Sequence, residues 1–501
     1  MRAWFLIVVL MMFLYRYLRR RRQYQEESLF GDQHGCHPMK SRFPIKWPLG
    51  LDVLHKQWLA NADQRLLAYQ QPFLDQLGPN LEIKIMGSIG YTTYDPPNVE
   101  AVLSSKFEDY YLGTRRGAMF PFIGEGIFTQ DGGAWRISRE LLRRPFLKTH
   151  YQDLRGFREP IENCLSKIST RDGVVDLQPL FFQFTLATTT ALIFGQPVES
   201  SEDEEQDSFA RSFDHASWIT TLRSRLTDLY WIYNPSHYRA ACKTIKTFAD
   251  GFVSRALSAN DHGKAEAVSD RYAFIEDLYA ALKDTSLVRD QLINILLAGR
   301  DTTACLLSWT FFLLVRHPHV LGRLKEEIAS VVGSDVNITR THIQKMGYLK
   351  CILNETLRLY PPIPLNVRFA KNTTWLPQGG GPDGDSPVLV RKGTGIGLVP
   401  YYMHRRKDIY GEDAMTFRPE RWQGPELDDI GWAYMPFHGG PRLCLGKDFA
   451  LMEASCLIVR ILQEFPDIRL PPGHSIVPTG QEKQELTVFL KSADGCKVVV
   501  R

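Results

Sequence analysis

The stretch FHGGPRLCLG, residues 437–446, constrains this chain more than any other, because it sets a single cysteine in a bed of glycine and proline. Apolar residues then recur at helix spacing, at positions 450, 454, 457, 458 and 461. Cys444 is therefore expected at or just before the N-terminus of the last long helix. Free backbone N–H groups and the positive end of the helix dipole gather there, and both favour thiolate over thiol.

The rest of this bed suits a flat, wide group that carries carboxylates. Gly439, Gly440 and Gly446 have no Cβ, so the backbone can approach such a group closely. Arg442 adds a fixed positive charge of the kind that binds a carboxylate. A thiolate, a close backbone and this arginine together describe a seat for haem.

A hydrolytic or purely structural role for Cys444 fits the sequence less well. A lone cysteine is most often a small buried hydrophobe, and a thiol or zinc hydrolase would need a histidine base nearby. His438 is close, but two glycines and a proline separate it from Cys444. The eight cysteines lie at positions 36, 164, 242, 305, 351, 444, 456 and 496, with no CxxC pair and no zinc spacing. This distribution favours a reducing compartment over a disulfide framework.

The stretch matches the signature F-x-x-G-x-R-x-C-x-G in full, through Phe437, Gly440, Arg442, Cys444 and Gly446. In this it resembles the cytochrome P450 family of haem-thiolate monooxygenases. The resemblance implies haem b (iron protoporphyrin IX), its iron bound axially by Cys444 and the other signature residues seating the cofactor. It also implies a mainly α fold with a minor β component, in one large domain behind an N-terminal membrane anchor.

The segment ETLR places Glu355 and Arg358 three residues apart, on one face of a helix. On its own this pattern indicates an ordinary surface ion pair, worth less than about 1 kcal/mol. FRPERW follows at residues 417–422, and the family resemblance implies that its Arg421 joins the pair. A buried network of that kind would fix the core around the haem.

AGRDTTA, residues 298–304, lies inside an apolar helical pattern that runs from about residue 287 to residue 316. Gly299 is expected to open space on one face of this helix. Asp301 and Thr302 put an acid and a hydroxyl in its middle, where local capping or back-bonding is the simplest role for them. The resemblance implies instead that they line the distal side of the haem and manage protons for oxygen activation.

Three further residues are implied as haem contacts. Trp135 and Arg139 of the segment WRISR are four apart and share a helix face, and the resemblance places them against a haem propionate. Arg368 stands where members of the family often have another propionate ligand.

The chain begins MRAWFLIVVLMMFLYRYLRRRR, an apolar run from residue 3 to residue 15 followed by Arg16 and then Arg19–Arg22. The run is shorter than the roughly 20 residues of a spanning helix, and a signal peptide or an in-plane anchor also fits its length. No small-residue A-x-A site follows, however. The positive block after the run predicts an uncleaved, single-pass anchor in the endoplasmic reticulum membrane, with a cytosolic body.

The expected organisation is a membrane anchor with its basic flank at residues 1–22, a Pro-rich connector at 23–50 and a haem-thiolate catalytic domain at 51–501. Residues 51–370 are typical of helices, whereas short strands alternate with turns beyond Lys371. GTGIG at 393–397 is interpreted as turn glycines because no helix follows it, and the tail at 484–500 as a hairpin. Residues 1–50 hold nine Lys/Arg and three Asp/Glu, a net charge of +6, whereas the whole chain carries +4. The excess positive charge therefore lies in the N-terminal segment, and no nucleic-acid partner is inferred from it.

The resemblance implies a monooxygenase that inserts oxygen from O2 into a C–H bond and takes electrons from outside. The sequence has no flavin or nicotinamide fingerprint, so an NADPH-cytochrome P450 reductase is the expected partner. The details AGRDTTA, FRPERW, GGGPDG and FHGGPRLCLGKDFA resemble the fungal alkane and fatty-acid hydroxylase branch, and the anchor favours a lipophilic substrate. The apolar candidates for pocket walls are residues 120–128, 297–302 and 362–367.

Three alternatives stay open on the sequence. The same branch can be recruited to tailor a fungal secondary metabolite, such as a polyketide or a terpenoid. A haem-thiolate isomerase, dehydratase or peroxygenase does not use O2, although such enzymes often lose the Asp301-Thr302 pair. A haem sensor or carrier without catalysis is the third, and the acid and alcohol within the long helix argue against it.

Overall fold

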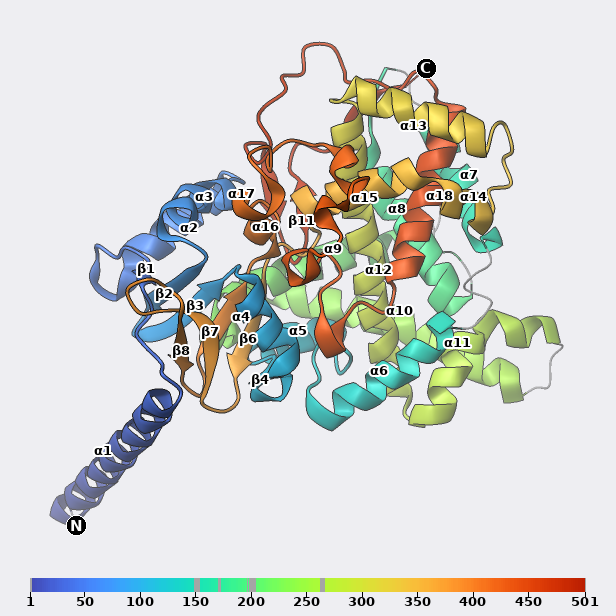
Figure 1. The fold of residues 1–501 in the computed structure, drawn as a ribbon. Helices are drawn as coiled ribbons and strands as arrows, with labels where there is room; N and C mark the ends of the chain where they lie inside the picture. Colours follow the sequence, from blue (N-terminus) through green and yellow to red (C-terminus); the bar gives the residue numbers. More distant parts are fainter. Residues whose placement is uncertain are drawn as a thin grey trace.

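The computed structural model describes residues 2–147, 154–169, 173–195, 197, 204–261 and 266–500. A mainly helical body carries a smaller region of strands along one side, and the N-terminal helix α1 (Arg2–Gln33) projects away from it (Figure 1). The predicted fold class, mainly α with a minor β component, is confirmed.

The body contains helices of very different lengths, many of them packed around one central helix. Those described are α2 (Leu51–Ala62), α3 (Leu66–Leu77), α4 (Pro96–Glu100), α5 (Arg115–Ile123), α6 (Gly132–Leu147), α7 (Arg155–Ser169), α8 (Leu177–Phe194), α9 (Glu204–Arg225), α10 (Ser236–Asp261), α11 (Glu266–Leu282), α12 (Thr285–Leu314), α13 (Pro318–Val331), α14 (Arg340–Lys345), α15 (Gly347–Leu359), α16 (Pro400–Met403), α17 (Lys407–Tyr410) and α18 (Lys447–Glu464).

The strands are short. Those described are β1 (Ser41–Arg42), β2 (Asn80–Ile85), β3 (Ser88–Thr93), β4 (Tyr110–Tyr111), β5 (Val174–Asp176), β6 (Asn366–Ala370), β7 (Thr374–Gly380), β8 (Ser386–Val390), β9 (Gly395–Leu398), β10 (Gln484–Leu486), β11 (Leu490–Ser492) and β12 (Lys497–Val499).

The central helix is α12. Its first turn is capped by Asp284, whose carboxylate accepts hydrogen bonds from the backbone N–H groups of Ser286 (2.9 Å) and Leu287 (3.2 Å). It ends at Leu314, just before Pro318, in agreement with the predicted extent. Its apolar residues belong to both hydrophobic clusters of the body, so α12 runs through the middle of the core (Figure 1).

Strands also occur where the sequence predicted mostly helix. Six strands form one sheet in the order β1-β2-β3-β9-β6-β4. β2 and β3 make a hairpin that turns at Met86-Gly87, where φ is positive at both residues (50° and 81°). β3 then pairs in parallel with β9, which sets Gly90 beside Gly395. The prediction of helix is therefore corrected for residues 80–93, whose pairing partner lies far along the chain.

Two smaller predictions concern the C-terminal third. Gly393 does lie in a turn (φ +86°), but Gly395–Leu398 form β9, so the interpretation of GTGIG as turn glycines is corrected for its second half. The predicted tail hairpin is confirmed for β10 and β11, which pair antiparallel. β12 pairs instead with β5.

The first half of α1 exposes its apolar side chains, with Trp4 at 74 %, Leu10 at 72 % and Phe13 at 68 % exposure. Within the described part of the chain, α8 is the one helix long and apolar enough by itself to cross a membrane, with mean hydropathy 1.3. α8 is mostly buried in the body, which makes it a core helix. α12 and α13 pass the same criterion only as a pair, bent by 112°.

The second half of α1 is fixed to the strand region. Glu27 forms an ion pair with Arg391, directly after β8 (2.8 Å), and the His34 ring lies 4.2 Å from the Trp375 ring of β7, centroid to centroid. The helix thus continues past residue 22, where the sequence places the end of the anchor. Residues 23–33 are a docked part of α1, and the Pro-rich segment follows them.

Candidate active site

Cys444 lies in the loop before α18, as predicted, and its backbone N–H donates to the carbonyl oxygen of Phe437 (3.0 Å). The residue has exposed surface. Burial nevertheless raises the pKa of the thiol, against the lowering effects of the Gly446 N–H and of the charges on Arg139 and Lys447. The residue thus has accessible surface although its thiol is largely desolvated.

This environment corrects one expectation. The helix terminus and nearby charges were expected to favour the thiolate, but burial outweighs them and the pKa of Cys444 is raised. A bound metal reverses that balance, because a coordinating thiol loses its proton outright. An open sulfur that needs a metal to stay ionised fits the axial ligand of a haem.

The glycines of the loop face the protein. A Cβ on Gly440 (φ +63°) would overlap the carbonyl oxygen of Leu103, and one on Gly439 would overlap the Trp432 ring. The expectation that these two glycines admit a flat group is therefore corrected, because they allow the loop to pack against its own neighbours. Gly446 is the N-cap residue of α18.

A cluster of arginines lies beside the loop. Arg368 of β6 is 3 % exposed, and its Nη2 is 3.2 Å from Nε2 of His438. Burial lowers the pKa of Arg368 well below its usual range, and the charges of Arg115 and Arg442 lower it further. Asp131, 2.9 Å from Arg442, opposes these charges. In the described part of this cluster, the guanidinium groups of Arg115, Arg368 and Arg442 are balanced by the single carboxylate of Asp131. This excess of positive charge suits the propionates of a haem.

The arginine cluster also includes a residue that was missed in the sequence and a histidine. Arg115, at the start of α5, donates to Asn366 Oδ1, and only an Arg-Arg dipeptide marks it in the sequence. Burial and the charge of Arg368 lower the pKa of His438 to about 3. A neutral histidine held against an arginine is poorly suited to be the base of a thiol hydrolase.

The two predicted residues of α6 reach the same loop. Trp135 is 3 % exposed, and the Arg442 guanidinium lies 4.4 Å from its ring centroid. Its Nε1–H has no hydrogen-bond partner among the residues that the structure describes. Arg139 donates to the Leu443 carbonyl oxygen (2.8 Å). A buried indole N–H without an acceptor is a donor that a propionate oxygen would satisfy. The donor set around the loop therefore fits a haem.

The Glu355–Arg358 pair is buried, with both side chains fully enclosed, so a surface ion pair is ruled out. Arg358 donates to both carboxylate oxygens (2.8 Å each), and Arg421 Nε donates to Oε1 (3.0 Å). Trp422 Nε1 donates to Oε2 (3.0 Å). Burial alone would raise the pKa of Glu355, but the hydrogen bonds and charges of its arginine partners lower it overall. The three predicted residues are thus brought together in one network.

The central turns of α12 are buried except at Ala298, Gly299 and Thr302, which are partly exposed. Thr302 Oγ1 donates to the Ala298 carbonyl oxygen (2.6 Å), which is the back-bonding that the sequence also allowed. A Cβ on Gly299 would lie 2.6 Å from Thr189 Oγ1. The expectation that Gly299 opens space is therefore corrected, because the missing side chain admits α8.

Asp301 occupies the buried side of the same turn. Its side chain is 7 % exposed, and its Oδ1 accepts a hydrogen bond from Arg300 Nη1 (2.9 Å). Burial raises the pKa of Asp301 although Arg300 lowers it. A carboxyl group with a raised pKa, next in sequence to a partly exposed hydroxyl, is suited to donating a proton.

Glu453 of α18 is a buried acid that was not predicted from the sequence. Its residue is 0 % exposed, and its carboxylate accepts a hydrogen bond from Thr188 of α8. Burial raises the pKa of Glu453 to about 8, although the hydroxyls of Thr188 and Thr303 lower it. Its only sequence signal is a glutamate among apolar residues of a helix.

Replacing Glu453 by glutamine is expected to flatten the pH dependence of stability. Between its ordinary pKa of 4.5 and its folded value of about 8, Glu453 binds a proton only in the folded state. Stability therefore falls as pH rises through this window, by up to about 1.4 kcal/mol per pH unit. Urea unfolding near pH 5 and near pH 8 measures the slope. Glu464→Gln, at the exposed end of α18, is the control and should retain the slope of the parent. An unchanged slope in Glu453→Gln would mean that Glu453 is ionised in the folded protein.

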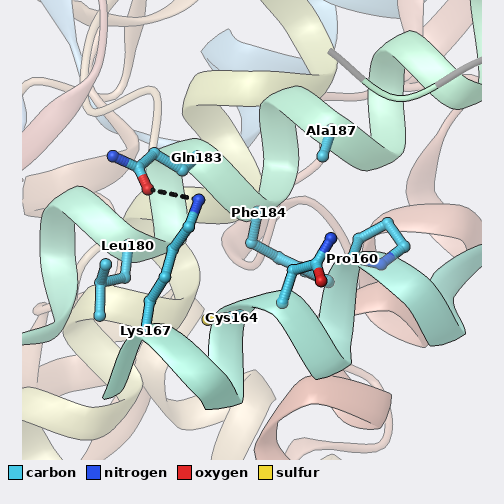
Figure 2. A pocket seen from close by; sticks show the side chains of 8 residues that line it. Pro160, Cys164, Lys167, Leu180, Gln183, Phe184 and Ala187 are labelled. Carbon is cyan, nitrogen blue, oxygen red and sulfur yellow. Dashed lines mark hydrogen bonds between the residues drawn. The ribbon is translucent and has the colours of Figure 1, made fainter. Parts of the chain in front are cut away.

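A small pocket lies between α7 and α8 (Figure 2). Its volume of about 10 Å³ admits about one water molecule. The side chain of Lys167 reaches Gln183 there, with Nζ and Oε1 3.3 Å apart (Figure 2). None of the predicted site residues lines it, and it is too small for a substrate.

Comparison with known proteins agrees with the geometry of the site. The model of the family described as Cytochrome P450 matches residues 46–494. A protein named cytochrome P450 from Arthroderma benhamiae is 41 % identical over 99 % of this chain and 98 % of its own length. Cytochrome P450 52A13 of Debaryomyces hansenii is 39 % identical over 89 % of this chain and 90 % of its own. For cytochrome P450 52A5 of Candida maltosa the values are 40 %, 82 % and 81 %. With a thiol-bearing loop and an arginine cluster that fit haem, the chain belongs to the cytochrome P450 family of haem-thiolate monooxygenases.

Proposed function

We propose that this cytochrome P450 hydroxylates the alkyl chain of a long-chain fatty acid or an alkane at its terminal carbon. The observation that carries the proposal is that the partly exposed residues in the central turns of α12 are Thr302 and two residues without polar side chains, Ala298 and Gly299. The candidate walls add exposed apolar side chains, with Phe120 at 42 %, Ile363 at 38 % and Leu365 at 45 % exposure. Such surfaces bind an alkyl chain by burying it. The motif resemblance to the alkane and fatty-acid hydroxylase branch supports the same class.

The proposed roles of the site residues follow from their chemistry. Cys444 Sγ would hold the iron, and the propionates would be bound by Trp135, Arg139, Arg368 and Arg442, with Arg115 beside them. Bound haem supplies the activation of dioxygen for insertion of oxygen into a C–H bond. Asp301 holds and releases a proton, and the Thr302 hydroxyl on the open side of α12 directs it. The Glu355–Arg358–Arg421 network keeps the core around the loop rigid.

A P450 of this kind receives its electrons from a reductase, and we propose an NADPH-cytochrome P450 reductase. Exposed Lys447, directly after the loop, supports a basic docking face for it. Arg442 is a poor candidate for that face, because its side chain is 10 % exposed and paired with Asp131.

We also propose that residues 1–22 anchor the protein in the endoplasmic reticulum membrane, with residues 51–501 forming the cytosolic catalytic domain. The described apolar side chains in the first half of α1 are exposed, and lipid would cover them. Further exposed apolar side chains, Trp47, Trp58 and Trp231 among them, offer additional contact with a lipid surface. Removal of residues 2–22 should move the protein from the membrane pellet towards the soluble fraction, and an unchanged distribution would contradict the anchor.

The substrate class is tested with the full-length protein, a reductase and NADPH. Medium- and long-chain fatty acids, alkanes and polyketide acids are offered separately, and products are identified by mass spectrometry. We expect terminal hydroxylation of the fatty acids or alkanes that depends on NADPH and O2. Products from polyketide acids alone would favour the tailoring alternative. Turnover that does not need O2 would contradict a monooxygenase reaction.

A further inference from the structure

The acid of the α12 turn is linked to the neighbouring helix α9. Arg300 Nη1 lies 2.9 Å from Asp301 Oδ1 and 2.6 Å from Asp214 Oδ1 of α9. The side chains of Arg300 and Asp301 are 5 % and 7 % exposed, whereas that of Asp214 is 61 % exposed. One buried guanidinium thus joins an acid inside the protein to an acid at its surface.

Arg300 is packed between α8 and α9. Its guanidinium lies 5.2 Å from the ring of Phe182 in α8 and 5.4 Å from the ring of Phe213 in α9. Its carbonyl oxygen accepts a hydrogen bond from Thr185 Oγ1 (2.7 Å). Within the described part of the chain, its Nε is buried without a partner. Nη1, by contrast, is shared between the two acids. Since both Phe213 and Asp214 belong to α9, a shift of α9 changes how Arg300 is divided between its partners.

We propose that Arg300 and Asp214 are positioning residues for Asp301, so that the seating of α9 on α12 sets how readily Asp301 releases its proton. This inference rests on the proposed role of Asp301 in proton delivery. With α9 seated, Asp214 holds part of the arginine and the Asp301 carboxyl is only partly neutralised. When α9 moves away, Arg300 turns wholly to Asp301 and holds it as a carboxylate.

The charges around Asp301 set the direction of each effect. Arg300 and Lys491 of β11 lower its pKa, while burial and the charge of Asp214 raise it. Lys491 is itself paired with Glu485 of β10 (3.6 Å). Cys305, one turn further along α12, is buried with a raised pKa, and α8 contributes the uncharged Thr185 and Phe182. Loss of Asp214 should therefore lower the pKa of Asp301, and loss of Arg300 should raise it.

The test uses the full-length enzyme with its reductase and a substrate that it turns over. Product formed per NADPH consumed is measured between about pH 6 and pH 9. If turnover needs protonated Asp301, this ratio declines as pH rises. We expect Asp214→Asn to move the decline to lower pH by about half a unit or more, Arg300→Gln to move it to higher pH, and Asp214→Glu to restore it.

Asp207→Asn is the matched control, because Asp207 is an acid of the same helix whose ion pair is with Arg211. It should leave the profile in place. A second readout is independent of turnover. The infrared carbonyl band of protonated Asp301 is identified as the band that disappears in Asp301→Asn. In Asp214→Asn this band should titrate at lower pH than in the parent. The carbon-monoxide spectrum checks haem incorporation in each variant. If Arg300→Gln does not fold, the Asp214→Asn variant still tests the inference, because the side chain of Asp214 is exposed.

The outcomes separate the two claims. Profiles and band titrations that are the same in Asp214→Asn, Asp207→Asn and the parent, while Asp301→Asn loses coupling, would overturn the inference alone. Full coupling in Asp301→Asn would overturn the proposed role of Asp301 itself. Shifts of opposite sign in Asp214→Asn and Arg300→Gln would support the inference.

Discussion

Replacing Cys444 by serine is expected to abolish the thiolate-type absorption of the reduced carbon-monoxide complex, together with NADPH-dependent hydroxylation. A serine hydroxyl stays protonated and donates far less electron density to iron than a thiolate does. The loss of activity should exceed the roughly 10- to 100-fold that removal of a residue supporting a metal ligand costs. Absorption spectra of the purified protein, supplied with haem during expression, measure the effect.

Cys456→Ser is the matched control for this experiment. Cys456 lies in α18, on the same helix that follows the loop, but it is 2 % exposed and burial raises its pKa to about 12. It should keep the thiolate-type spectrum. Persistence of that spectrum in Cys444→Ser would show that another atom holds the iron.

Replacing Glu355 by glutamine is expected to destabilise the protein by about 3–5 kcal/mol, because it leaves buried arginine charge without its partner. Arg358 and Arg421 both donate to this carboxylate from positions with almost no exposure. Since the pKa of Glu355 is lowered on folding from its ordinary 4.5, its contribution is present above that value and is lost as pH falls through the folded value. The variant should therefore also lose part of the acid sensitivity of the parent. Urea unfolding at neutral and at acidic pH measures both effects.

Glu412→Gln provides the comparison for an exposed ion pair. Glu412 is 2.8 Å from Lys407, and its side chain is 89 % exposed. Its replacement should change stability far less than that of Glu355, because solvent screens an exposed ion pair. Equal losses in the two variants would mean that the buried network contributes nothing beyond an ordinary charge pair.

The local features of the site were predictable from the sequence. Cys444 before a helix, the shared face of Glu355 and Arg358, and Asp301 with Thr302 in one helical turn all follow from spacing along a single element. Arg421 required the family resemblance, because spacing alone does not show that a later loop closes onto α15.

What the sequence missed depends on contacts between distant segments. Gly299 was expected to open space on one face of its helix and Gly440 to let the backbone approach a flat group, whereas their missing side chains admit Thr189 and the Leu103 backbone. Glu453 is unusual because it is buried in the folded protein beside hydroxyl groups of α8 and α12. The pairing of β3 with β9 likewise joins segments that lie far apart in the sequence, so the local pattern at residues 80–93 gave no partner.

The docking of α1 has a mechanical consequence. The C-terminal end of α1 is held to the strand region by the Glu27–Arg391 ion pair and by the contact of His34 with Trp375. A tilt of α1 is therefore transmitted to the body of the enzyme. If residues 3–15 lie in lipid as proposed, any tilt of α1 relative to the membrane would turn the whole enzyme with it. The contacts between α1 and the strand region would then set which side of the enzyme faces the membrane surface.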